Sequence, residues 1–466
     1  MTGPRGGEGQ TLDLSEVING QKLNLFVVRL LALSTLITFF DGYDLNSISF
    51  AAPAIMREYG IDRAAFGGVF GIGLFGFMLG GFIFGWLGDR IGRRPTIVIA
   101  AASFGVLTFV TSFASTVGEF TALRFIGGLA IGGLVPVTWA LNIEFAPPRY
   151  RATVVTIIML GYAVGSSLGG VISAWLIPTY SWRVVFWVGG VLPVLVSVLL
   201  HFGLPESIRF LAVKGRRPEE IARTVRRLRP EIAARPDMRF IVSDEHATQG
   251  SARGFRLADL FVGRLRAITP LLWIAYIGSS MAVFFLASWM PTLAEASGLD
   301  RASAALGASL LSLGGAVGGL LLMRFVDRFG AIAVTLMPVI ACPLVAMLGL
   351  FHFDSAEFMQ YMAVLGLFVI GGHTGLHSIA GLFYPSAIRS NGAGWAISVA
   401  KVGSIAGPWI GGLLLGAHFD LAHIFLFASL PLVVLALCIF PLGLQHRRLR
   451  ADDARAIAPV RLTQEG

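Results

Sequence analysis

The sequence predicts an all-α membrane protein in which twelve transmembrane helices form two pseudo-symmetric six-helix bundles. Three observations predict this fold. The chain is 55% hydrophobic and only 14% charged, whereas a soluble domain is about a quarter charged. Apolar segments of about 20 residues, the length that spans a bilayer as a helix, recur along the chain. The second half also repeats motif positions of the first half at one constant offset.

The apolar segments divide the chain into spans and connecting loops. We expect spans at residues 25–48, 64–87, 96–116, 119–143, 152–176, 183–203, 268–290, 302–324, 331–351, 358–383, 393–416 and 420–443. The segment 204–266 is polar and Arg-rich, with helical periodicity after Pro218. The expected domains are therefore a tail at 1–24, a bundle at 25–203, a central loop at 204–266, a bundle at 267–443 and a tail at 444–466.

The internal repeat has an offset of 238 residues without a gap. Matches of Gly alone carry little weight because the chain contains 57 of them. Ordered matches of Pro, Asp and Arg are more specific. The offset pairs Pro53 with Pro291, Gly80 with Gly318, Asp89 with Asp327, Arg90 with Arg328, Pro147 with Pro385, and Arg151 with Arg389.

The basic residues predict orientation. They concentrate in alternate loops, as the positive-inside rule requires, and the central loop is the most basic segment. This distribution explains the net charge of +9 without a nucleic-acid partner, and it indicates the lipid bilayer instead. We expect a multi-pass inner (cytoplasmic) membrane protein with both termini in the cytoplasm. The first 24 residues are too polar for a cleavable signal peptide.

A charged loop separates the second and third spans. The segment from Gly85 to Pro95 reads Gly-Trp-Leu-Gly-Asp-Arg-Ile-Gly-Arg-Arg-Pro. It resembles the loop signature of the major facilitator superfamily, Gly-x-x-x-Asp-Arg/Lys-x-Gly-Arg/Lys-Arg/Lys. The resemblance implies a latch that closes the cytoplasmic side, whereas the alternative is that these charges serve only topology and helix capping. The candidate gate residues are Asp89, Arg90, Arg93, Glu144 and Arg151, with a reduced second copy at Asp327 and Arg328.

Three ionisable residues lie inside the first and fourth spans. Such residues are costly in a membrane and are functional candidates by default. Asp41 and Asp44, at i and i+3, share one helix face, and Arg124 lies at a similar depth. Two close carboxylates do not both ionise easily, so at least one can carry a proton. An Arg–Asp contact here would be a proton-sensitive ion pair, and a static structural pair is the alternative.

A second group of ionisable residues lies in spans 10 and 11. His373 and His377, at i and i+4, share a helix face, and Lys401 lies at a depth that matches His377. A buried Lys beside two His residues suits a carboxylate. The His spacing also suits a metal, but no third ligand is apparent, so we expect no metal. Either His could instead be a packed core residue.

Several motifs together resemble the aromatic acid:proton symporter family, whose members include benzoate and 4-hydroxybenzoate-type transporters. The resemblance covers all twelve expected spans. Its most specific part is Asp41-Gly-Tyr-Asp44 in the first span. The other parts are the loop signature, Leu204-Pro-Glu-Ser-Ile-Arg-Phe210, Arg124-Phe-Ile-Gly-Gly, Ser288-Trp-Met-Pro291 and Phe383-Tyr-Pro-Ser-Ala-Ile-Arg389.

The resemblance implies proton-driven uptake of benzoate-like acids for catabolism. Asp41 and Asp44 match the acids that the family requires in span 1, and Arg124 matches its span-4 Arg. Lys401 stands where family members usually carry Arg, and the span-10 stretch has two His residues where the family is often amide-rich. Aromatic side chains could stack on a substrate ring, although Trp in a membrane helix more often packs or anchors. These candidates are Tyr43, Trp139 and Trp289.

The sequence therefore predicts a monomeric symporter and not an enzyme. It would import an aromatic carboxylate such as a benzoate or hydroxybenzoate by alternating access, with protons as the coupling ion and no cofactor. The alternatives within transport are a carrier for another organic acid or a sugar, and a proton-coupled exporter. A membrane sensor is the alternative outside transport. Nucleotide-binding loops, metal clusters and nucleophile constellations are not apparent in the sequence.

Overall fold

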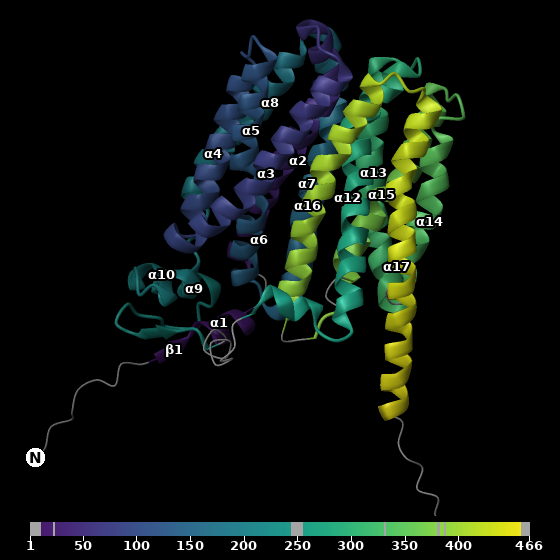
Figure 1. Cartoon of the computed structure of the whole chain (residues 1–466). Coiled ribbons are helices and arrows are strands. Elements are labelled where there is room, and N and C mark those ends of the chain that lie inside the picture. Colours follow the sequence, from purple (N-terminus) through teal and green to yellow (C-terminus); the bar gives the residue numbers. More distant parts are fainter. Residues whose placement is uncertain are drawn as a thin grey trace, which may run out of the picture. The chain divides into compact units, whose positions relative to one another are not determined.

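The described chain is almost entirely helical. The computed structural model describes residues 11–21, 24–243, 255–329, 332–379, 383–385 and 388–457. Figure 1 shows long helices that run side by side within each part of the chain. Their bounds are α2 (Leu25–Tyr59), α3 (Arg63–Ile91), α4 (Arg93–Thr111), α5 (Val117–Gly132), α6 (Leu134–Phe145), α7 (Arg151–Thr179), α8 (Trp182–Gly203), α12 (Leu265–Ala296), α13 (Arg301–Phe329), α14 (Ile332–Met347), α15 (Ser355–Ile379), α16 (Arg389–Gly416) and α17 (Leu421–Ile457).

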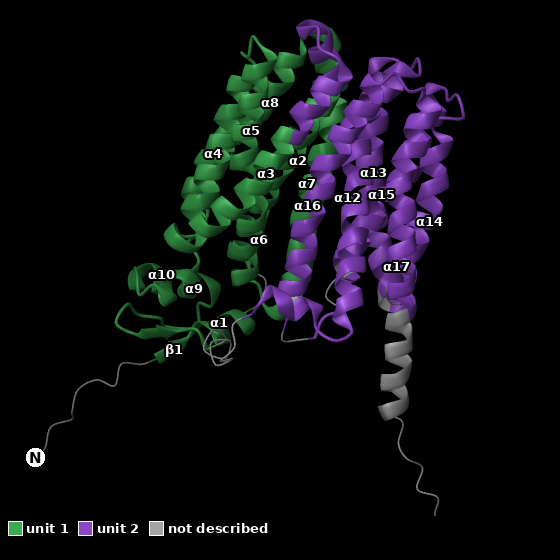
Figure 2. Cartoon of the chain, in the orientation of Figure 1, with its two compact units in different colours: residues 1–51, 72–254 green, residues 52–71, 255–466 purple. Residues whose placement is uncertain are grey.

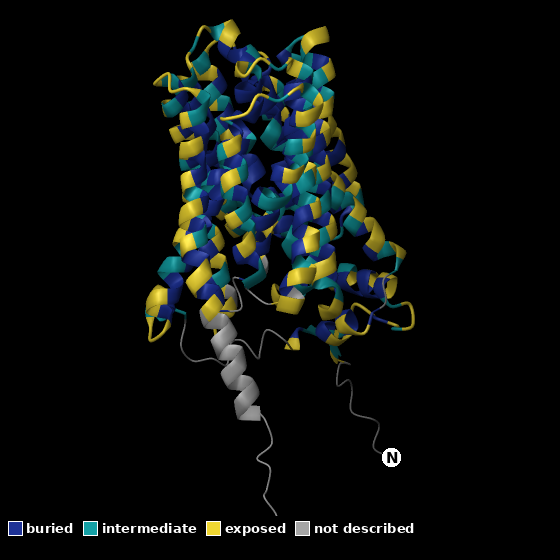
Figure 3. Cartoon of the chain, turned by 90° about the vertical axis from the view of Figure 1, so that its right-hand side faces the viewer, coloured by how far each residue is buried: buried dark blue, intermediate teal, exposed yellow. Residues whose placement is uncertain are grey.

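These helices confirm the predicted fold class. Within the described ranges, eleven segments are long and apolar enough to cross a membrane, with α5 and α6 counted as one segment that bends at Gly133. The apolar helix α14 is shorter, at 16 residues, and occupies the place of the ninth expected span. Exposed and buried residues alternate along the helices (Figure 3). Many exposed side chains are large and apolar, as expected of lipid-facing surfaces; examples are Phe82, Trp175, Phe202 and Leu437.

The chain forms two compact units that do not follow chain order exactly. Unit 1 comprises residues 1–51 and 72–254, and unit 2 comprises residues 52–71 and 255–466 (Figure 2). Residues 52–71 are the end of α2 and the beginning of α3. Within unit 2, Arg57 Nη1 lies 3.1 Å from Glu295 Oε2 of α12, and the Phe70 and Trp289 rings lie 5.4 Å apart.

The same glycine contacts occur in both units at the predicted offset. A Cβ on Gly80 of α3 would lie 2.1 Å from the Leu129 carbonyl oxygen of α5. A Cβ on Gly318 of α13 would lie 2.2 Å from the Leu367 carbonyl oxygen of α15. Each residue of the second pair lies 238 positions after its counterpart. Glycine allows these backbones to touch where lipid provides little other drive for helix association.

Two further sets of contacts follow the same rule, which confirms the internal repeat in three dimensions. Gly76 packs on the backbone of Phe125, and its counterpart Gly314 packs on that of Ala363. Gly165 packs on the backbone of Phe39, and its counterpart Gly403 packs on that of Ile277. The first set again joins α3 to α5 and α13 to α15. The second set joins α2 to α7 in unit 1 and α12 to α16 in unit 2.

The N-terminal tail and the central loop pack together in unit 1. Strand β1 (Thr11–Asp13) pairs in parallel with β2 (Arg239–Ile241). The short helices are α1 (Leu14–Asn19), α9 (Ile208–Val213) and α10 (Pro218–Leu228), and a 3₁₀ helix η2 (Leu257–Phe261) precedes α12. We call β1, α1, α9, α10 and β2 the tail–loop subdomain. Its core contains Leu14, Val17, Ile18, Leu211, Ile221, Val225, Leu228 and Val242.

Helix α2 is longer than its apolar segment. The first expected span ends at residue 48, but α2 continues to Tyr59 with Pro53 inside it. Proline removes only one backbone hydrogen bond, and the residues around it are held by packing. Ala51, Ala52 and Ile55 are fully buried, so their burial sustains the helix beyond the hydrophobic run.

Candidate functional site

Unit 1 buries an ion pair between α2 and α5. Asp44 is 6% exposed and Arg124 is 7% exposed, and Arg124 Nη1 lies 3.3 Å from Asp44 Oδ2. Thr108 of α4 donates its hydroxyl to Asp44 Oδ1 at 2.8 Å. Arg124 Nη2 donates to the same Thr108 oxygen at 3.2 Å. The carboxylate, the hydroxyl and the guanidinium therefore form one closed polar network.

The guanidinium of Arg124 also contacts an aromatic ring and has one N–H donor without an acceptor among the described residues. Its central carbon lies 5.1 Å from the centre of the Phe186 ring, a cation–π distance. Its Nε atom is buried and has no hydrogen-bond acceptor among the described residues. A buried donor without an acceptor is costly, so an acceptor from a ligand would stabilise this side chain.

Asp41 has different surroundings from Asp44. It is fully buried and lies close enough to the Tyr162 hydroxyl of α7 for the two groups to interact electrostatically. The ion pair of Arg124 is formed with Asp44. The two carboxylates predicted to share one helix face therefore have different neighbouring helices, α7 for Asp41 and both α4 and α5 for Asp44.

Gly42 and Tyr43 set the rotation of α2 in unit 1. A Cβ on Gly42 would lie 2.1 Å from the Tyr162 carbonyl oxygen, so only glycine allows α7 to approach this closely. The Tyr43 hydroxyl donates to the Val185 carbonyl oxygen of α8 at 3.0 Å. Tyr43 is 1% exposed and holds α2 against α8 in this structure.

Unit 2 brings His373 and His377 of α15 against α12. The Ser279 hydroxyl lies 3.0 Å from His373 Nδ1, and the Tyr276 hydroxyl lies 3.4 Å from His377 Nδ1. The two imidazole rings have centres 5.0 Å apart. The positive charge of Lys401 on α16 lies close enough to act on both rings.

This unit 2 cluster can bind an anion. Lys401 supplies a basic side chain, and each imidazole has a second ring nitrogen that donates or accepts according to its tautomer. His373 is half-buried and His377 is exposed, so both can meet a ligand. Groups of three His, Cys, Asp or Glu side chains that could hold a metal do not occur among the described residues.

Sequence reasoning did not include Tyr276 and Ser279 in this cluster. The signal was present, because both are polar, lie in one apolar span and are separated by three residues, so they share a helix face. Ser279 is also the 238-residue counterpart of Asp41. The repeat therefore places a polar side chain at the same position of α2 and α12.

The remaining aromatic candidates differ in how they are packed. Trp289 is fully buried, and its Nε1 donates to the Pro408 carbonyl oxygen at 2.8 Å. Trp139 is half-buried and packs beside Ala146, Val154 and Ile158. Its indole Nε1 is buried without an acceptor among the described residues. Of these two indoles, only that of Trp139 lacks an acceptor among the described residues.

Arg93 is the centre of the charged loop in unit 1. Its Nη1 lies 2.7 Å from Asp89 Oδ1, and its Nη2 lies 3.2 Å from Glu144 Oε1. It also donates to the Gly88 carbonyl oxygen at 2.7 Å. One guanidinium thus joins the end of α3, the start of α4 and the end of α6.

The other gate candidates have separate contacts. Arg90 lies 4.6 Å from the Trp86 ring centre, and Arg151 Nε donates to the Ala146 carbonyl oxygen at 3.3 Å. The ion pair of Glu144 is thus with Arg93 and not with Arg151. In the second half, Arg328 lies 5.3 Å from the Phe329 ring centre, and the side chain of Asp327 lies outside the described residues.

Glu206 caps the beginning of α4. Its Oε1 accepts from the backbone amides of Arg93 at 2.9 Å, Arg94 at 3.3 Å and Ser207 at 2.8 Å. Burial raises the pKa of Glu206, and these amide hydrogen bonds offset only part of that effect. The Pro-Glu-Ser motif after α8 therefore supports the charged loop.

The comparisons identify the family of the chain. The model of the Major Facilitator Superfamily matches residues 34–371 and 272–462. A gallate transporter of Pseudomonas putida is 34% identical, with 95% of this chain and 97% of that protein covered. The 4-hydroxybenzoate transporter PcaK of Pseudomonas putida is 32% identical, with 94% and 97% covered. The benzoate transport protein of Acinetobacter baylyi is 30% identical, with 92% of each covered.

Solved structures agree with the fold. The xylose transporter XylE of E. coli, in a partially occluded inward-open conformation, has a TM-score of 0.68 at 17% identity, covering 90% of this chain and 98% of that chain. A bacterial homologue of the human lysosomal transporter Spinster has a TM-score of 0.66 at 17% identity, covering 92% and 99%. The matched family consists of transporters and not enzymes. The chain is a multi-pass membrane transporter that belongs to the major facilitator superfamily, and within it to the aromatic acid:proton symporter family that its motifs predicted.

Proposed function

We propose that the protein imports an aromatic carboxylate together with protons by alternating access. The observation that carries this proposal is the separation of two charged clusters. A buried Arg124–Asp44 ion pair lies in unit 1, and a cluster of one lysine and two histidines lies in unit 2. Relatives at 30–34% identity that carry gallate, 4-hydroxybenzoate and benzoate support the substrate class.

The unit 1 cluster handles the proton. Protonation of Asp44 removes the charge that holds Arg124, so the ion pair weakens and Arg124 is released. Asp41, one turn away and beside Tyr162, is the second carboxylate that exchanges protons. A proton therefore changes the contacts between α2 and α5, which is the requirement for coupling it to a conformational change.

The unit 2 cluster handles the solute anion. Lys401 supplies the charge that attracts a carboxylate, and His373 and His377 supply donors for the carboxylate or a ring hydroxyl. Tyr276 and Ser279 orient the two imidazoles through their contacts with Nδ1. Gallate and 4-hydroxybenzoate both carry ring hydroxyls that can form hydrogen bonds with such donors and acceptors.

The proposal includes a cellular setting. The protein acts as a monomer in the inner membrane. Both of its termini lie in the cytoplasm, because the basic loops belong on that side. It supplies aromatic acids for catabolism, and protons are its coupling ion.

Uptake in cells tests the proposal. Radiolabelled gallate, 4-hydroxybenzoate and benzoate are presented to cells that express the protein or carry an empty vector, with and without a protonophore. We expect accumulation of at least one acid that the protonophore abolishes. Uptake that survives collapse of the proton gradient overturns the coupling. Accumulation of none of these acids overturns the substrate class, and efflux from preloaded cells would instead make the protein an exporter.

A further inference from the structure

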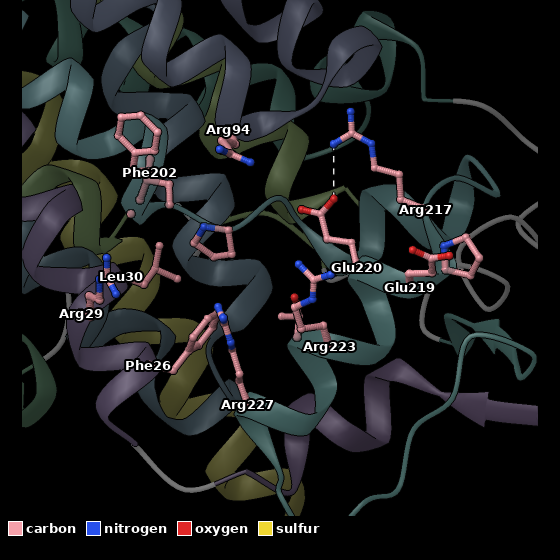
Figure 4. A pocket seen from close by; sticks show the side chains of 15 residues that line it. Phe26, Arg29, Leu30, Arg94, Phe202, Arg217, Glu219, Glu220, Arg223 and Arg227 are labelled. Atoms are coloured by element: carbon pink, nitrogen blue, oxygen red, sulfur yellow. Dashed lines mark hydrogen bonds and ion pairs between the residues drawn. The ribbon is translucent and has the colours of Figure 1, made fainter.

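A basic pocket lies outside the two clusters described above. It is a cavity of about 540 Å³ in unit 1, lined by the beginning of α2, the end of α8 and helix α10 of the tail–loop subdomain (Figure 4). Its volume is typical of a small-molecule site. The lining contains two glutamates, Glu219 and Glu220, and five arginines, namely Arg29, Arg94, Arg217, Arg223 and Arg227.

The arginines outnumber the groups that could neutralise them. Arg217 Nη1 pairs with Glu220 Oε2 at 3.3 Å, and Arg94 donates to the His201 carbonyl oxygen. Arg29, Arg223 and Arg227 have no ion pair with any described carboxylate. Among the described residues, four guanidinium groups without an ion pair (Arg29, Arg94, Arg223 and Arg227) and one remaining carboxylate, Glu219, therefore border the cavity. This balance favours an anion.

The pocket is held in shape by local contacts. Asn24 Oδ1 accepts from the Val27 amide at the start of α2. The same side chain donates to the carbonyl oxygens of Arg227 at 3.1 Å and Leu228 at 3.0 Å. Arg227 extends from α10 toward Phe26 of α2 (Figure 4). Arg29 lies beside the end of α8, because a Cβ on Gly203 would be 3.6 Å from its Nη2.

Apolar side chains border the same pocket. Phe202, at the end of α8, lines the pocket and is 78% exposed, and the half-buried Phe26, at the start of α2, lines it too. Both helices cross the membrane, so these side chains lie where a span meets the polar layer. A site with arginines next to exposed apolar residues is complementary to an anionic lipid, whose charged headgroup is joined to apolar acyl chains. A soluble anion would use only the arginines.

We propose that this pocket binds the headgroup of an anionic phospholipid. The phosphodiester would contact Arg29, Arg223 and Arg227, and the first acyl carbons would lie over Phe202 and Phe26. A bound lipid of this kind would join α10 to the beginning of α2. The proposal does not depend on the transported solute.

Lipid titration of the purified full-length protein tests this. Native mass spectrometry in detergent would follow binding of dioleoyl phosphatidylglycerol, with dioleoyl phosphatidylcholine as the neutral probe. We expect selective binding of the anionic lipid, weakened about tenfold in R223Q/R227Q because each arginine near a surface contributes several-fold. R29Q, on another helix, should also weaken it.

The matched control is R235Q/R239Q. It removes two exposed charges beside or within β2 that do not line the pocket, and it should bind the lipid as the wild type does. Equal binding by the wild type, R223Q/R227Q and R29Q overturns the proposal. Displacement of phosphatidylglycerol by millimolar inorganic phosphate would also overturn it, because the site would then take a free anion.

Discussion

At the scale of single residues, Arg124 is a buried charge whose stability depends on its partner Asp44. It is charged, 7% exposed and neutralised by one carboxylate. Removing one partner of a buried ion pair typically costs about 3–5 kcal/mol, because the other charge is left uncompensated. The pair is therefore sensitive to any change in the protonation of Asp44.

Replacing Asp44 should separate binding from accumulation. Asp44→Asn keeps one of the two oxygen acceptors that Thr108 and Arg124 use, but cannot change its charge with a proton. We expect it to abolish accumulation of substrate against a gradient while exchange of labelled for unlabelled substrate continues. The measurement is uptake and counterflow in proteoliposomes. Glu119→Gln, at the exposed start of α5, is the control, and normal accumulation by the Asn variant would remove Asp44 from coupling.

Replacing Lys401 should mainly affect substrate affinity. Lys401→Gln removes the charge beside His373 and His377. A charged hydrogen bond is worth about 1.5–3 kcal/mol, so we expect KM for the transported aromatic acid to rise at least tenfold. Lys401→Arg retains a cation and should transport with a smaller change. Lys214→Gln, an exposed lysine, is the control, and an unchanged KM in Lys401→Gln would exclude this residue from the anion site.

At the scale of elements, the turn between α3 and α4 depends on one glycine and one glutamate. Gly92 has a φ of 110°, a conformation that other residues rarely adopt. A Cβ there would lie 2.1 Å from Glu206 Oε2. Glu206 in turn accepts from the first amides of α4. The loop signature and the Pro-Glu-Ser motif are therefore one structural unit.

The raised pKa of Glu206 predicts a pH dependence. Between the ordinary glutamate pKa of 4.5 and the raised value in the folded protein, the folded state binds more protons than the unfolded state. Stability contributed by this group is therefore full below that window and declines as pH rises through it. The melting temperature of the wild type should fall relative to that of Glu206→Gln across the window. A constant difference at all pH values would contradict this.

At the scale of the whole molecule, the duplication sets the scaffold and the charges break its symmetry. The glycine contacts of α3 with α5 recur in α13 with α15. The charged residues of the gate loops recur, but those inside the spans do not, because Arg124 falls opposite Met362 and Lys401 opposite Ala163. Asp41 falls opposite Ser279, which contacts His373. Each unit has therefore kept its helix packing and specialised its polar residues.

The repeated packing predicts matched effects of two substitutions. In Gly80→Ala and Gly318→Ala the new methyl group would lie 2.1 and 2.2 Å from a backbone oxygen. Overpacking of this kind costs about 1–3 kcal/mol. Both variants should lower the melting temperature in detergent by similar amounts. Gly85→Ala, whose Cβ would meet nothing within 4 Å, is the control, and a change in only one of the two variants would contradict equivalent packing.

The sequence by itself determined the helical membrane fold, the repeat and the residue types of the candidate sites. The length and hydrophobicity of the apolar segments and the constant offset of the repeat can be read directly from the amino-acid sequence. The first span was predicted to end at residue 48, but helix α2 continues through Pro53 to Tyr59, since packing rather than hydropathy sustains it there.

Only the tertiary structure decided which of these residues meet. Asp41 and Asp44 differ by about 60° around the helix axis, so the rotation of α2 against α7 at Gly42 decides which carboxylate reaches Arg124. The pairing of Glu144 with Arg93 likewise depends on how the helix ends pack. Helix rotation results from contacts between segments far apart in the chain, and a local pattern does not contain that information.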